Sequence, residues 1–175
     1  MIPLGSTDMT LSRMGLGTWA IGGGPAWNGD LDLQICIDTI VEAHRCGINL
    51  IDTAPGYNFG NSEVIVGQAL KQLPRREVVV ETKCGIVWER TGSLFNKVGD
   101  RQLYKNLTPE SIREEVEASL QRLGIDTIDI YMTHWQSVEP CFTPIAETVA
   151  TLNALKKEGK IRAIGAANVD VGHIR

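Results

Sequence analysis

Short apolar runs alternate with amphipathic segments along most of this chain, and this alternation restricts its fold more than any other feature. Five runs are apolar through their centres, as strands buried on both faces are; they cover residues 14–18, 48–53, 78–83, 127–134 and 161–166. Parallel strands joined by crossover helices produce such a pattern. The sequence therefore predicts an α/β fold with a parallel sheet, preceded by a short β-hairpin with strands at 2–4 and 10–12.

Capping residues mark where the helices between these strands begin and end. Hydroxyl side chains that precede a helical period favour N-caps, and glycines that follow one favour left-handed C-terminal caps. The predicted N-caps are Ser62, Thr108 and Thr143, of which the last two precede a proline, and the predicted terminal glycines are Gly47, Gly124 and Gly159.

Two connections are unusually long, a glycine-rich one over residues 19–30 and another over 84–107. Both follow the carboxyl ends of predicted strands. In parallel barrels that end carries the active site, and connections longer than about 12–15 residues are often functional loops. We therefore expect these segments to be binding loops.

The charge pattern argues against nucleic-acid and membrane partners. The formal charge is −4 over 175 residues, without a Lys/Arg run that would follow a phosphate backbone. No segment resembles a signal peptide or approaches the ~20 apolar residues of a membrane helix. The sequence predicts a cytoplasmic protein and does not determine its oligomeric state.

Cysteine placement also favours the cytoplasm. Cys36, Cys46, Cys84 and Cys141 are scattered, as reduced thiols in packing roles are. A metal site built on Cys84, Cys141 and His134 would lack any closely spaced ligand pair, and we predict no metal.

Four chemically capable side chains gather where predicted strands end. Asp52, Lys83 and His134 stand at the ends of the second, third and fourth strands, and Tyr57 follows the second. Charges buried there are costly unless paired, so Asp52 and Lys83 are expected to neutralise each other. Taken alone, the Asp52–Lys83 pair fits a structural salt bridge at a barrel mouth as well as it fits a catalytic pair. Tyr57 and His134 favour a catalytic interpretation.

The residues around these four resemble the aldo-keto reductase family, and bacterial members in particular. Asp52-Thr53-Ala54-Pro55-Gly56-Tyr57, with Gly60-Asn61-Ser62-Glu63 after it, is similar to the signature around that family's aspartate and tyrosine. Further similar segments follow in family order, namely 15–19, Thr82-Lys83, His134-Trp135 and 159–165. The resemblance implies a (β/α)8 TIM barrel. Because such a barrel takes about 250 residues, it also implies a truncated, incomplete single domain of about five βα units over residues 1–175.

The resemblance implies NAD(P)H-dependent reduction of an aldehyde or ketone to an alcohol. Hydride would come from the nicotinamide and the proton from Tyr57. Lys83 would lower the tyrosine pKa from its ordinary value of about 10, and Asp52 would hold Lys83. His134 would hydrogen-bond the carbonyl oxygen.

Cofactor and substrate contacts are likewise carried over from the resemblance. The implied cofactor contacts are Gly17, Thr18, Trp19, Asp52 and Asn168, and the implied substrate contacts are Trp27, Trp88 and Trp135. Ala167 stands where many members have a serine. NADPH and NADH stay equally open, because the cofactor's diphosphate and adenosine bind late in the barrel. Small aldehydes or 2-oxoaldehydes are the expected substrates.

The sequence also fits three other interpretations in part. Gly15-x-Gly17-x-x-Ala20 fits a loose Rossmann fingerprint, but glycines at 22–24 delay the helix that the fingerprint requires. Lys83 at a strand end could form a Schiff base, as in barrel lyases. The chain could also bind cofactor as a regulatory subunit without turnover. Residues 1–175 alone are expected to be inactive and to self-associate through open edge strands.

Overall fold

The computed structural model describes residues 1–27, 29 and 31–174; Asn28 and Asp30, in the predicted loop 19–30, and Arg175 lie outside the described residues. All five predicted parallel strands are present: β3 (Gly15–Gly17), β4 (Leu50–Asp52), β5 (Val79–Cys84), β9 (Ile128–Thr133) and β10 (Ile161–Ala166). They pair in the order β10-β9-β5-β4-β3, so neighbours in the sheet are neighbours in the chain.

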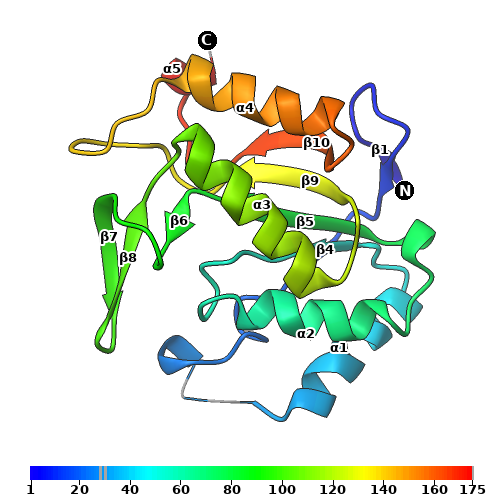
Figure 1. Ribbon diagram of the computed structural model, residues 1–175. Helices are drawn as coiled ribbons and strands as arrows, with labels where there is room; N and C mark the ends of the chain where they lie inside the picture. Colours follow the sequence, from blue (N-terminus) through cyan, green and yellow to red (C-terminus); the bar gives the residue numbers. More distant parts are fainter. Residues whose placement is uncertain (28, 30, 175) are drawn as a thin grey trace.

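Helices connect these strands and cover the outer face of the sheet (Figure 1). They are α1 (Leu33–Arg45), α2 (Asn61–Leu70), α3 (Pro109–Leu123) and α4 (Ile145–Lys157), with α5 (Val171–Ile174) after β10 and the short helices η1 (Pro25–Trp27) and η2 (Arg75–Glu77) in connections. The core between the layers includes Ile40, Val66, Ile112 and Leu155, all fully buried. Five successive βα units wound in this order form the corresponding part of a (β/α)8 barrel.

Most of the predicted helix ends are confirmed. The Thr108 hydroxyl accepts a hydrogen bond from the Ser111 amide and caps α3. Gly47, Gly124 and Gly159 all have positive φ angles, as the sequence predicts.

Two predicted N-caps are wrong. In one the hydroxyl group bonds to another part of the fold, and in the other the helix begins one residue later than predicted. Helix α2 begins at Asn61 after Gly60, while Ser62 is fully buried and donates to the carbonyl oxygen of Thr18 at 2.9 Å. Helix α4 begins at Ile145 with Pro144 at the N-cap position, so Thr143 lies one residue too early to cap it.

The prediction of a loop over residues 84–107 is wrong, because this segment folds into a small antiparallel sheet. The strands β6 (Ile86–Val87), β7 (Ser93–Val98) and β8 (Arg101–Lys105) pair in the order β6-β8-β7. This sheet lies at the carboxyl ends of β5, β9 and β10 (Figure 1). Strand β7 is mostly exposed, so it lacks the apolar centre by which the buried strands are recognised.

The predicted N-terminal hairpin lies at the opposite end of the sheet. Strands β1 (Ile2–Pro3) and β2 (Thr10–Leu11) pair antiparallel. Met9, between them, is buried against Val79, Ile130 and Ala163 near the amino ends of three strands. The hairpin therefore covers the end of the sheet that lies away from the predicted catalytic residues.

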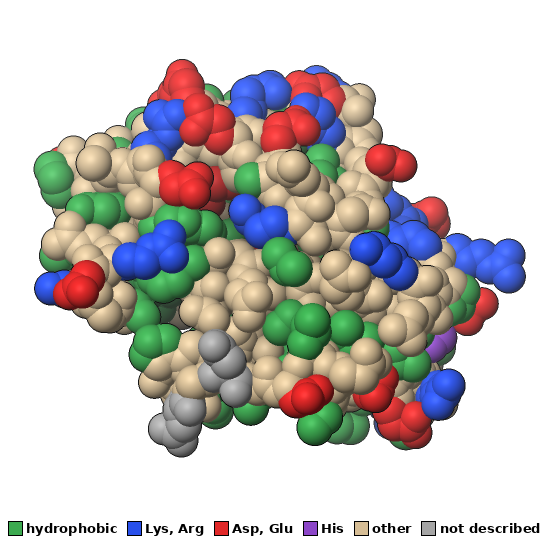
Figure 2. Space-filling model, turned by 60° about the horizontal axis from the view of Figure 1, so that its bottom comes forward, with side chains coloured by type: hydrophobic (Ala, Val, Ile, Leu, Met, Phe, Trp, Pro, Cys, Tyr) green, Lys and Arg blue, Asp and Glu red, His purple; other side chains and the backbone are tan. Residues whose placement is uncertain are grey.

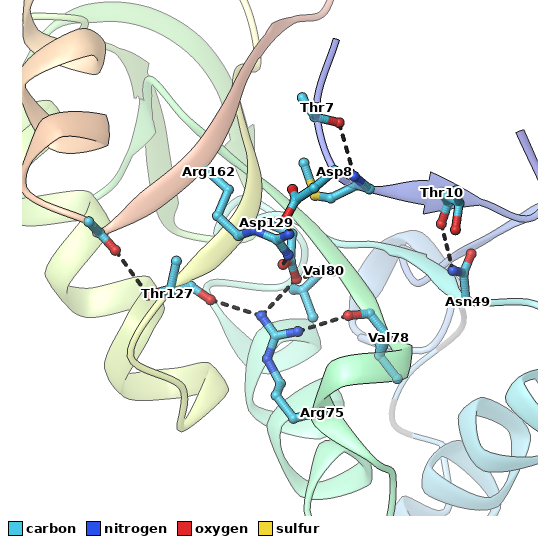
Figure 3. Close-up of polar contacts among 12 residues, drawn as sticks. Thr7, Asp8, Thr10, Asn49, Arg75, Val78, Val80, Thr127, Asp129 and Arg162 are labelled. Carbon is cyan, nitrogen blue, oxygen red and sulfur yellow. Dashed lines mark hydrogen bonds and ion pairs between the residues drawn. The ribbon is translucent and has the colours of Figure 1, made fainter. Parts of the chain in front are cut away.

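A buried carboxylate ties three strands together at this covered end (Figure 3). Asp129 on β9 is 1% exposed and accepts hydrogen bonds from the Val80 amide at 2.9 Å and from Arg75 at 2.7 Å. Its second oxygen pairs with Arg162 of β10 at 2.5 Å. Arg75 also donates to the carbonyl oxygens of Val78 and Thr127. This cluster links β5, β9 and β10.

Charges of both signs are intermixed on the face shown in Figure 2, without a large patch of Lys and Arg. No helix among residues 1–27, 29 and 31–174 is both long and apolar enough to span a bilayer.

We predict that Asp129→Asn lowers the free energy of unfolding by about 2–3 kcal/mol, because two guanidinium groups lose their shared buried acceptor. Urea unfolding monitored by circular dichroism measures the change. Asp8→Asn is the matched control, since Asp8 contacts the same Arg162 but is 84% exposed, and should cost less than about 1 kcal/mol. Equal losses of unfolding free energy in both variants would show that the buried Asp129 cluster stabilises the fold no more than an exposed ion pair does.

Candidate active site

The parallel register places three ionisable side chains side by side at the carboxyl ends of β4 and β5. Asp52 is the direct partner of Glu81 on β5, and Lys83 lies two residues beyond Glu81. Lys83 is 6% exposed. Its ammonium donates to a carboxylate oxygen of Asp52, to the Thr53 carbonyl at 2.9 Å and to the Tyr57 hydroxyl at 3.3 Å. The expected pairing of Asp52 with Lys83 is therefore present.

Tyr57 and His134 complete the group. Tyr57 lies in the turn after β4, and its ring packs edge to face on His134 with centroids 5.7 Å apart. His134 follows β9, and its amide donates to the carbonyl oxygen of Cys84 at 2.9 Å. The structure thus brings together all four side chains that the sequence singled out, from three neighbouring strand ends.

Burial controls the titration of the imidazole. Burial first, and the Lys83 ammonium second, lower the pKa of His134, Asp52 opposes them, and the net pKa is about 4. Nδ1 of His134 is buried and has no hydrogen-bond partner among the described residues. The ring is therefore neutral near pH 7 and can donate one hydrogen bond.

The expected lowering of the Tyr57 pKa by Lys83 is present, but the net direction differs from the expectation. Lys83 does lower the pKa of Tyr57, but burial raises it by more, and the net direction is upward from the ordinary value. Desolvation of the phenolate outweighs its attraction to the ammonium because Asp52 already neutralises much of that charge. Tyr57 thus holds its proton at neutral pH.

A cavity of about 440 Å³ opens directly over Tyr57 and His134. Aromatic and aliphatic side chains form most of its wall, and Asn168 contributes an amide. The lining includes Trp19, Ile86, Phe95, Leu103 and Trp135. Cavities of this size and character, with a few converging polar groups, are typical small-molecule sites.

Two of the five predicted cofactor contacts line this cavity, and the other three lie at the ends of β3 and β4. Gly17 pairs with Asp52 across β3 and β4, and Trp19 and Asn168 line the wall. Asn168 donates to the His134 carbonyl at 2.7 Å, and its amide oxygen accepts no hydrogen bond from the residues that the structure describes. Thr18 is fully buried, and its hydroxyl bonds to the Asp52 carbonyl and to Ser62. The side chain of Thr18 does not line the cavity, because the interior of the fold occupies it.

The three predicted substrate-contacting tryptophans differ in position. Trp135 lines the cavity. Trp27 packs edge to face on Trp19, with centroids 5.2 Å apart, and stands behind the wall. Trp88 packs on Phe59 and does not line the cavity. Trp27 and Trp88 are therefore not direct lining residues, because each supports an aromatic side chain that lies closer to the cavity.

Glu81 is a further ionisable residue of the site that was not predicted from the sequence. Burial raises the pKa of its carboxyl, the adjacent Asp52 raises it further, and Lys83 opposes both. A signal existed, since Glu81 precedes Lys83 by two residues, and alternation along a strand puts both on the same face.

Comparisons with known proteins agree with this geometry. The model of the Aldo/keto reductase family matches residues 13–175. The chain belongs to the aldo/keto reductase family. Membership of this family excludes the Rossmann alternative. The strands also lie in sequential order across the sheet, whereas the order of a Rossmann sheet reverses at its centre.

Two bacterial relatives illustrate the likeness within the aldo/keto reductases. An NADH-specific methylglyoxal reductase of Escherichia coli (strain K12) is 90% identical over 99% of this chain and 53% of its own length. An aldo-keto reductase of Bacillus subtilis (strain 168) is 43% identical over 96% of this chain and 46% of its own. The chain thus spans about half the length of the curated relatives it matches.

A solved structure shows the same fold. The glycerol dehydrogenase of Gluconobacter oxydans superposes with a TM-score of 0.82 and 40% identity, over 99% of this chain and 50% of that one.

A second titratable group of this aldo/keto reductase chain lies behind β5. Glu115 of α3 accepts hydrogen bonds from the Gly85 amide at 2.8 Å and from Ser111 at 3.1 Å. Burial nevertheless raises its pKa from 4.5 to about 8. The folded state therefore binds more protons than the unfolded state between these pH values, and this group's contribution to stability falls as the pH rises.

We predict that Glu115→Gln flattens the pH dependence of stability between pH 4.5 and about 8, the window set by the raised pKa. The wild type loses stability from this group across that range, whereas the neutral amide does not titrate. Urea midpoints measured at several pH values test this. Glu114→Gln removes a neighbouring carboxylate that is 66% exposed and should leave the profile unchanged. A profile that Glu115→Gln does not alter would refute the assignment.

Proposed function

We propose that this chain contributes the catalytic half of an NADH-dependent reductase that converts small aldehydes and 2-oxoaldehydes to alcohols. The contact between the Lys83 ammonium and the Tyr57 hydroxyl carries the proposal, because it gives a proton donor a fixed countercharge. The high identity to an NADH-specific methylglyoxal reductase supports the cofactor and the substrate class.

Tyr57 supplies the proton in this mechanism. When bound, the nicotinamide provides the hydride that reduces the carbonyl carbon. As negative charge develops on the carbonyl oxygen, Tyr57 transfers its proton to that oxygen and becomes a phenolate. Lys83 stabilises the phenolate more than the phenol, so its effect is greatest as the proton leaves. Asp52 holds Lys83 in place.

His134 orients the substrate. Its neutral imidazole faces the same cavity as Tyr57 and donates a hydrogen bond to the carbonyl oxygen. Two donors that converge on one oxygen fix the direction of the carbonyl group. Because the pKa of His134 is about 4, this arrangement persists throughout the neutral range.

The residues present fit a nicotinamide ring. The free amide oxygen of Asn168 can accept a hydrogen bond from a carboxamide, and Trp19 offers an aromatic wall on the same cavity. Gly17 lies open beside Asp52, where a side chain would narrow the approach. These residues would hold the nicotinamide end of the cofactor.

The Schiff-base alternative receives no support from this geometry. A lysine ammonium has three hydrogens, and those of Lys83 face three acceptors on Asp52, Thr53 and Tyr57. An amine held in this way has no lone pair directed at a substrate. Lys83 is better suited to electrostatic support than to covalent attack.

Substrate-dependent oxidation of NADH by the full-length protein tests the proposal. We expect turnover with methylglyoxal and other small aldehydes, weaker turnover with NADPH, and little with steroids or large sugars, because the related NADH-specific enzyme is a methylglyoxal reductase. Absorbance at the nicotinamide band measures each rate. Cofactor binding without turnover of any carbonyl compound would instead indicate the regulatory-subunit alternative.

We further predict that Tyr57→Phe reduces kcat by at least about 100-fold, because it removes the transferred proton. Affinity for NADH should stay within about threefold, since the cofactor contacts are elsewhere. Tyr104→Phe is the matched control, because it removes the hydroxyl of a tyrosine on β8 that contacts Gln102. Wild-type turnover in Tyr57→Phe would eliminate Tyr57 as the proton donor.

A further inference from the structure

The turn that carries Tyr57 contains three successive residues in the left-handed region. Asn58 has a φ of 51°, Phe59 of 54° and Gly60 of 86°. Glycine adopts this conformation freely and asparagine tolerates it, but an aromatic residue there is strained. Strain of this kind persists only where surrounding contacts hold it, and it is concentrated at functional sites.

Contacts on two sides hold the turn. The Asn58 side chain donates to the carbonyl oxygen of Gly22 at 2.9 Å, which ties the turn to the connection after β3. A β-carbon on Gly60 would lie 2.7 Å from the Arg122 side chain, so Arg122 packs closely on the turn from α3. Both contacts act on the neighbours of Phe59 and leave its ring to be held by other groups.

The Phe59 ring is enclosed by a cation and an aromatic edge. The Arg101 guanidinium lies over its face, 3.8 Å from the centroid. Trp88 meets it edge to face, with centroids 5.6 Å apart and the planes at 88°. Electrostatic attraction between a guanidinium and an aromatic face favours this geometry.

Arg101 belongs to the β7–β8 hairpin, whose other contacts with the rest of the fold include Phe95 packed on Trp135 and hydrogen bonds near its base. In the part of the chain that the structure describes, β7 pairs with β8 alone and β8 pairs with β6. At the base, Ser93 bonds to the carbonyl oxygen of Val138 at 2.5 Å and accepts from the Cys141 amide. Arg101 stands at the other end, next to the hairpin turn at Gly99.

We propose that Arg101 is a positioning residue: by docking the hairpin tip on Phe59 it keeps the strained turn in place and thereby sets the Tyr57 hydroxyl against Lys83. The same contact closes the cavity, because Phe95, Val98 and Leu103 of the hairpin and Phe59 of the turn all line it. The positioning role rests on the proposed reductase function, whereas the docking contact stands on geometry alone.

The experiment compares Arg101→Leu, Arg101→Lys and Lys97→Leu in the full-length protein. Arg101→Leu removes the cation from the ring, so the turn relaxes and kcat for methylglyoxal falls about tenfold, while KM for NADH changes less than about twofold. Arg101→Lys keeps a cation and should recover most of kcat. Lys97 is exposed on the same hairpin, so Lys97→Leu controls for the loss of charge.

Hydrogen–deuterium exchange of the peptide covering residues 56–61, without substrate or cofactor, measures docking independently of activity. Exchange should accelerate in Arg101→Leu and match the wild type in Lys97→Leu. Unchanged exchange would overturn the docking contact, and faster exchange with unchanged kcat would overturn the positioning role. If the wild type reduces no carbonyl compound, the reductase proposal and the positioning role both fail, and exchange alone decides whether Arg101 docks the hairpin.

Discussion

The arrangement of the catalytic end depends on how the buried charge of Lys83 is neutralised. An ammonium that is only 6% exposed is tolerable only with close partners, and Asp52 on the next strand supplies the countercharge. The remaining hydrogens reach the Thr53 carbonyl and the Tyr57 hydroxyl, so the same group also fixes the turn after β4. Charge pairing thus couples the strand register to the position of the proposed proton donor.

The two ends of the sheet have different tasks. At the amino ends, the Asp129 carboxylate is shared by two arginines and a backbone amide, all within the fold, and the hairpin β1–β2 covers the strands. At the carboxyl ends, the His134 imidazole and the Asn168 amide lie at the wall of a cavity. Polar groups that bond to one another within the fold stabilise the amino ends. Polar groups that face the cavity allow the carboxyl ends to bind a ligand.

The family's motifs carried most of the information about the site. Asp52, Tyr57, Lys83 and His134 were all identified from their places at predicted strand ends, because parallel strands present their carboxyl ends at one edge. Glu81 and the net direction of the Tyr57 pKa were not, since both depend on which groups are desolvated together. The internal hydrogen bonds of the Thr18 hydroxyl were not foreseen for the same reason, because a motif does not reveal that a hydroxyl is used internally.

The sequence by itself determined the five parallel strands and most helix ends, because apolar periodicity, glycine and proline act over a few neighbouring residues. Only the tertiary structure decided that 84–107 forms an antiparallel sheet, that Ser62 turns inward, and that Arg101 rests on Phe59. These features arise from contacts between residues distant in the chain. Local patterns cannot encode them, because the partner that stabilises each one is brought near only when the strands and helices have packed.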